Sequence, residues 1–69
     1  MEERGCWMQA KVCSVQEGQM EVCTLEGQRV LVWFPGAYEV CPGDVVSIAY
    51  DGRMTRSIPP QINALQVER

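Results

Sequence analysis

The chain has 69 residues, 46% of them hydrophobic and 22% charged, and a formal net charge of -3. The length predicts one domain over residues 1–69, near the lower limit at which a hydrophobic core alone offsets the lost chain entropy. The composition excludes a disordered chain, and the negative charge opposes nonspecific binding to nucleic-acid backbones unless a local basic patch outweighs it.

Residues 1–5 are mostly polar, and no apolar run follows them. The sequence therefore predicts neither a signal peptide nor a membrane-spanning segment. We expect a cytoplasmic protein that has no membrane partner.

Four cysteines and the absence of histidine bear on metal and redox chemistry. No Cys-x-x-Cys pair is present among Cys6, Cys13, Cys23 and Cys41, whereas zinc sites usually take their ligands in close pairs. Disulfides are also rare in the cytosol. The sequence therefore favours cysteines that act as small buried apolar residues, without metal or cofactor, and an all-thiolate zinc site is the alternative.

The first half predicts three strands joined by two short loops. Gln16-Glu17-Gly18-Gln19 recurs as Leu25-Glu26-Gly27-Gln28, and each segment lies between β-prone runs. Because Gly accepts a positive φ without steric cost, each segment is typical of a three-residue hairpin loop with a glycine bulge. We expect strands near 5–15, 19–25 and 28–34.

The apolar pattern predicts the register of both hairpins. The first loop would pair Val15 with Gln19, and the second would pair Thr24 with Gln28. A two-residue turn at 26–27 would instead bury a charged side chain. The predicted inner face is Met8, Ala10, Val12, Met20, Val22, Val30, Val32 and Phe34.

The opposite face of these strands mixes charged groups with large apolar ones. Such a face is either a binding surface or is covered by a loop or a chain end. We favour the interpretation that a loop or a chain end covers Leu31 and Trp33. The predicted outward residues are Lys11, Cys13, Glu21, Cys23, Arg29, Leu31 and Trp33.

The second half predicts two more strands and one stiff loop. One short helical turn fits around Ala37-Tyr38-Glu39, and Pro42-Gly43-Asp44 is a turn signal before a strand near 44–50. Two prolines then restrict the loop at 53–60 ahead of a last strand near 61–68.

Five short strands, no long helix and turn signals at spacings of roughly eight to twelve residues predict an all-β fold. A small five-stranded OB-like barrel fits this pattern best, and an SH3-like barrel is the alternative.

The second half also carries a specific motif. It reads Gly43-Asp44-Val45-Val46-Ser47-Ile48-Ala49-Tyr50-Asp51-Gly52, followed by Met54-Thr55-Arg56-Ser57-Ile58-Pro59-Pro60-Gln61-Ile62-Asn63-Ala64. With this motif the chain resembles a group of short uncharacterised bacterial β-barrel proteins, chiefly from Firmicutes, with a GDxVxIxYxG…MTxSIPPQIxA ending. The ending is distantly similar to YobA-like domains. The resemblance implies a five-stranded OB-like fold and no particular activity.

The sequence predicts no enzyme. Without histidine, a Ser-His or Cys-His nucleophile cannot form within one chain. No Gly-rich phosphate loop is present, and Asp44 and Asp51 lie about 20 Å apart along an extended strand, too far for paired carboxylates. Asp44 is expected to accept backbone hydrogen bonds in its own turn.

Binding is the function class that these patterns favour. The favoured hypothesis is a non-catalytic protein-interaction or structural module, which would contact a protein partner or a second copy through the Leu31 and Trp33 face or through a strand edge. The alternative is an OB-fold protein that binds single-stranded nucleic acid on the outer face of its second and third strands. The candidate binding residues under these hypotheses are Lys11, Arg29, Leu31, Trp33, Arg53, Thr55, Arg56, Ser57 and Gln61.

The polar residues of the 53–60 loop and its end have two interpretations. Thr55, Arg56, Ser57 and Gln61 could present hydrogen-bonding groups to a ligand at the barrel mouth. Alternatively, Thr55 and Ser57 could cap the turn, with Gln61 tying the loop to a neighbouring strand. We favour the second interpretation, because a turn must first satisfy its own polar groups.

Overall fold

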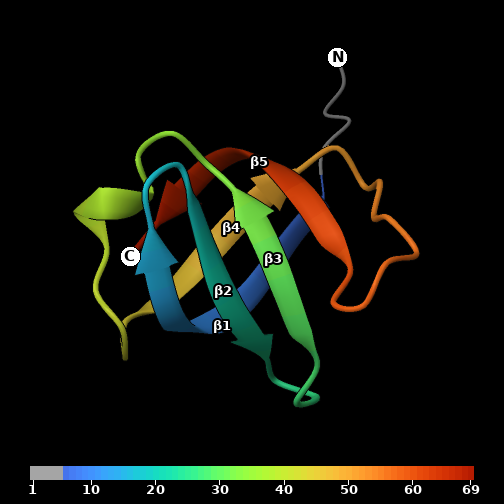
Figure 1. The fold of residues 1–69 in the computed structure, drawn as a ribbon, viewed down its shortest axis with the longest axis horizontal. Coiled ribbons are helices and arrows are strands. Elements are labelled where there is room, and N and C mark those ends of the chain that lie inside the picture. The colour runs from blue at the N-terminus through green and yellow to red at the C-terminus, as the bar shows by residue number, and fades with distance from the viewer. Residues whose placement is uncertain (1–5) are drawn as a thin grey trace.

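The computed structural model describes residues 6–69, which form a closed barrel of five strands (Figure 1). Around the barrel the order is β1-β2-β3-β5-β4, and β4 pairs back to β1. The pairs β1–β4 and β3–β5 join strands that are not consecutive, as in the Greek-key connectivity of OB-like barrels. The elements are β1 (Cys6–Gln16), β2 (Gln19–Thr24), β3 (Arg29–Trp33), the 3-10 helix η1 (Ala37–Glu39), β4 (Val45–Tyr50) and β5 (Gln61–Glu68).

This architecture confirms the predicted all-β OB-like barrel and the short helical turn after the third strand. The strand ends differ from the predicted ones by one residue at most, and the expected start at residue 5 lies outside the described residues. Among residues 6–69, no helix has the length and apolar character that a membrane crossing requires.

The second hairpin has the predicted register. Val22 pairs with Val30, and the Thr24 backbone N–H donates to the Gln28 carbonyl at 2.9 Å. Gly27 closes the loop at a φ of +88°, a conformation that favours glycine.

The first hairpin differs from the prediction near its loop. Val15 pairs with Met20 and not with Gln19, because the extra residue sits inside β1, at Cys13, and not in the loop. The pairing of Val12 with Val22 is as expected. A bulge bends and twists its strand, so here one long strand can pair with two neighbouring strands. β1 pairs with β4 through residues 6–11 and with β2 through residues 10–16.

The inner face of the barrel is apolar, as predicted. Among the side chains whose burial the structure describes, none that is polar or charged is buried. Met8 and Phe34 are partly buried and pack against the core. The buried core is Ala10, Val12, Met20, Val22, Val30, Val32, Ala37, Val40, Val46, Ile48 and Ile62.

The prediction that the cysteines are small buried residues is wrong. Cys6, Cys13 and Cys41 are exposed, Cys23 is half-buried, and all four are free thiols. Cys13 occupies the bulge and Cys23 lies on the outward side of β2, while Cys41 stands in the turn before β4. There the Cys41 backbone N–H donates to Asp44 Oδ2 at 2.9 Å, which confirms the expected role of Asp44.

Candidate interaction surface

The outward side chains of β2 and β3 form three cross-strand rows, which we call the outer face. Trp33 lies opposite Gln19, Leu31 opposite Glu21, and Arg29 opposite Cys23. Leu31 is half-buried, whereas Trp33 is 44% exposed. The expected cover of these two residues is therefore only partial.

The start of β5 supplies that partial cover. The Trp33 indole Nε1–H donates to Gln61 Oε1 at 2.9 Å, and the Leu31 backbone N–H donates to the Pro60 carbonyl, also at 2.9 Å. These bonds close the barrel beside the parallel pair of β3 and β5. They also fix the indole plane of Trp33, so its remaining exposed surface has a defined orientation.

An ion pair lies at the other end of the outer face. Arg29 Nε lies 3.4 Å from Glu21 Oε2, and the side chains are 73% and 27% exposed, respectively. Exposed pairs of this kind stabilise a fold little. Their effect is to place both signs of charge on one surface.

The proline loop, residues 51–60, runs between β4 and β5 and is the orange segment of Figure 1. Ser57 Oγ donates to the Pro59 carbonyl at 2.9 Å. Thr55 Oγ1 and Ser57 Oγ lie 2.6 Å apart. Because the single Ser57 hydroxyl proton is already donated to Pro59, Thr55 is the donor in this second bond. Thr55 Oγ1 accepts the Gln61 backbone N–H at 2.9 Å, and the Thr55 N–H donates to the Gln61 carbonyl at 3.0 Å. The Thr55 and Ser57 hydroxyls thus bind backbone groups of the loop and its end, and the Gln61 side chain ties that end to Trp33 of β3, as the favoured interpretation predicts.

A groove of about 390 Å³ separates the proline loop from the outer face. Its most prominent side chain is Ile58, which is 99% exposed. Sequence reasoning missed Ile58 as a candidate, although an isoleucine between a polar run and two prolines is a visible signal. The residues that line the groove are Glu21, Gln28, Arg29, Ile58, Pro59 and Pro60.

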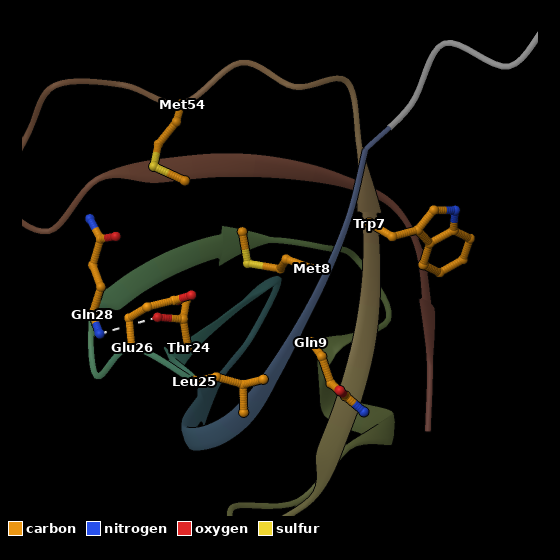
Figure 2. Close-up of a pocket in the computed structure, with 8 residues that line it drawn as sticks. All are labelled: Trp7, Met8, Gln9, Thr24, Leu25, Glu26, Gln28 and Met54. Atoms are coloured by element: carbon orange, nitrogen blue, oxygen red, sulfur yellow. Dashed lines mark hydrogen bonds between the residues drawn. The ribbon is translucent and has the colours of Figure 1, made fainter.

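A second depression, of about 300 Å³, lies near the β2–β3 turn (Figure 2). Figure 2 shows Met54 of the proline loop and Met8 of β1 extending from opposite sides, with the Trp7 indole pointing away from them. Thr24 Oγ1 already accepts the Gln28 backbone N–H, at 3.2 Å. The lining is Trp7, Met8, Gln9, Thr24, Leu25, Glu26, Gln28 and Met54, a set in which Glu26 is the only ionisable side chain.

The predicted cations do not gather at one place. Lys11 pairs with Cys23, which pairs with Arg29, so Lys11 and Arg29 belong to one row across three strands. Arg53 instead lines a separate depression of about 250 Å³ between the first half of the proline loop and the start of β5, and Arg56 is exposed within that loop. The outer face therefore combines Arg29, Leu31 and Trp33 but not the loop arginines.

Among the described residues, no group of three or more cysteine, aspartate or glutamate side chains is placed to hold a metal ion. The chemistry of the surface is that of apolar contact, hydrogen bonding and paired charge. No family model, curated protein or solved structure matches the chain. The resemblance to the short Firmicute barrel proteins therefore stays a prediction.

Proposed function

We propose that the chain is a non-catalytic, cytoplasmic protein-interaction module that binds a protein partner through the outer face and the proline loop. The observation that carries the proposal is Ile58, 99% exposed at the edge of an adjoining groove. Large apolar side chains that project beside a groove are typical of protein-binding surfaces.

The construction of the proline loop supports this proposal. Two prolines and the hydroxyl network around Thr55 and Ser57 hold the loop without any buried side chain. A segment that is already held in one conformation loses little entropy when a partner contacts it. The loop can thus present Ile58 to a partner at low entropic cost.

The non-catalytic and cytoplasmic parts of the proposal have separate support. The sequence has no histidine to activate a serine or cysteine nucleophile. Four free thiols in so small a domain suit a reducing compartment.

Single-stranded nucleic acid is the second candidate ligand. The Lys11–Cys23–Arg29 row and the exposed Trp33 favour it, because such ligands need cations and an aromatic platform. The support is weaker than for a protein, because Glu21 pairs with Arg29 within the same surface and the net charge is -3.

Selection from a displayed library of random peptides tests the protein-partner proposal. We expect peptides that bind the wild-type chain with micromolar affinity and lose about tenfold or more against Ile58→Asp. Leu25→Asp is the matched control, because Leu25 is 80% exposed but lies outside the groove. Peptides that bind all three chains equally would contradict the proposal.

An NMR titration with short single-stranded RNA and DNA pools, at low and at moderate salt, tests the second candidate. Shifts confined to Lys11, Arg29 and Trp33 that fade steeply with salt would favour nucleic acid over protein. A flat response at low salt would remove nucleic acid from consideration.

A further inference from the structure

The shape of the groove suits the same surface of a second copy of the chain. Ile58 projects with 99% of its surface exposed, directly beside a hollow of about 390 Å³ that Pro59 and Pro60 also line. A surface that carries both a projecting apolar side chain and a neighbouring hollow can meet its own copy across a two-fold axis. Each Ile58 then enters the hollow of the other chain.

The charges in the groove favour the same partner. Glu21 and Arg29 lie 3.4 Å apart and both line the groove. A partner with one sign of charge is attracted by one of these residues and repelled by the other. A second copy related by a two-fold axis brings its Arg29 to Glu21 and its Glu21 to Arg29, so all four charges gain opposite neighbours.

We infer that the partner of this surface is a second copy of this chain, joined in a two-fold dimer through Ile58 and the Glu21–Arg29 pair. The inference rests on the proposed function, because it names the partner of that same surface. Self-association covers Ile58, the most exposed large apolar side chain among the described residues, and it adds stability to a small core by mass action.

Sedimentation equilibrium of the full chain, from micromolar to millimolar concentration, tests the inference. Reductant is kept present so that the exposed Cys6, Cys13 and Cys41 form no disulfide-linked species. We expect a reversible monomer–dimer equilibrium that Ile58→Asp weakens by about tenfold or more and that Leu25→Asp leaves unchanged. A wild-type chain that stays monomeric at millimolar concentration overturns the inference, as does a dimer that Ile58→Asp leaves intact.

Charge reversal gives the sharper test, because it depends on the two-fold arrangement. Glu21→Arg makes the groove cationic and Arg29→Glu makes it anionic, so each variant alone should be monomeric. An equimolar mixture of the two variants should recover the dimer as a heterodimer, since one groove then complements the other. Circular dichroism checks that both variants fold. If Glu21→Arg does not fold, Ile58→Asp and Arg29→Glu decide the question alone. A mixture of folded variants that stays monomeric overturns the inference.

The outcome is separate from that of the peptide selection. Peptides that need Ile58, found for a chain that stays monomeric, would leave the interaction module standing and remove self-association. A dimer that needs Ile58, without any selected peptide, would leave self-association as the use of this surface.

Discussion

The β2–β3 hairpin and the proline loop are held in place by different interactions. In the hairpin, Val22 and Val30 pair across the strands and are fully buried, so apolar packing fixes the register. In the proline loop no side chain is buried, and hydroxyl–backbone hydrogen bonds with two prolines fix the path.

The difference explains why one region forms the core and the other carries the candidate binding residue. A segment that packing holds in place must bury its apolar side chains. A segment that hydrogen bonds and ring constraints hold in place can leave an apolar side chain in solvent. Ile58 is such a side chain.

Two isoleucines give the strongest test of this comparison. Ile48 is fully buried and Ile58 is 99% exposed. We expect Ile48→Ala to lower the free energy of unfolding by about 2 to 5 kcal/mol, and Ile58→Ala to change it by less than about 0.5 kcal/mol. Urea denaturation at a concentration where the chain is monomeric measures both. A large loss from Ile58→Ala would mean that the loop depends on apolar packing after all.

Removal of the central hydroxyl should have the next largest effect. Thr55→Ala eliminates the acceptor for the Gln61 N–H and the donor to Ser57. We expect a loss of about 1 kcal/mol in unfolding free energy and faster hydrogen exchange at the Gln61 amide, with little change at Val22. Thr55→Ser keeps the hydroxyl and is the control. Equal losses in both variants would assign the effect to the methyl group.

The bond between the loop end and β3 should contribute less. Gln61→Met keeps the side-chain length but removes the acceptor of the Trp33 indole N–H. We expect a loss of about 0.5 to 1 kcal/mol and faster exchange of that indole proton, because the bond is partly solvent-exposed. The Trp7 indole resonance serves as an internal reference, and no change at Trp33 would argue against the bond in solution.

The Glu21–Arg29 pair should matter least to the fold of the monomer. A double-mutant cycle with Glu21→Gln and Arg29→Gln is expected to give a coupling free energy below about 0.5 kcal/mol, since the Arg29 side chain is 73% exposed. Together with a large effect of charge reversal on dimerisation, this result would show that the pair acts between chains. A coupling well above that value would make it a structural feature of the barrel.

The sequence predicts the hairpin more completely than the loop, for a physical reason. Alternation along residues 19–34 reveals which side chains face the core, because a one-residue slip would turn every apolar group outward. The strands, the inner face and the second register follow from this alternation. The roles of Thr55 and Gln61 could be anticipated as well, since polar loop residues must satisfy nearby backbone groups.

Other features leave no trace in the pattern. The bulge at Cys13 takes up the extra residue that the prediction placed in the loop, so Val12 pairs with Val22 in either case. The apolar alternation up to Val12 is therefore the same with and without the bulge. The groove between Glu21 and Ile58 depends on the three-dimensional path of the proline loop, which local propensities do not determine. The cysteines were misassigned because their average preference for burial outweighed the outward positions of Cys13 and Cys23.

The parallel pair of β3 and β5 has a consequence for folding. The ladder between these strands has three residue pairs, Leu31–Gln61, Val32–Ile62 and Trp33–Asn63, and each pair joins residues 30 positions apart in the chain. The contacts within the β1–β2–β3 meander are far more local and so involve less loop-closure entropy. The meander should therefore form early, and the β3–β5 seam should close later, as should the β1–β4 seam, whose pairs join residues 34 to 44 positions apart. The β3–β5 seam has three pairs, whereas the β1–β4 seam has six, so in the native state the barrel should open first between β3 and β5, a motion that amide exchange at Ile62 and Asn63 would detect.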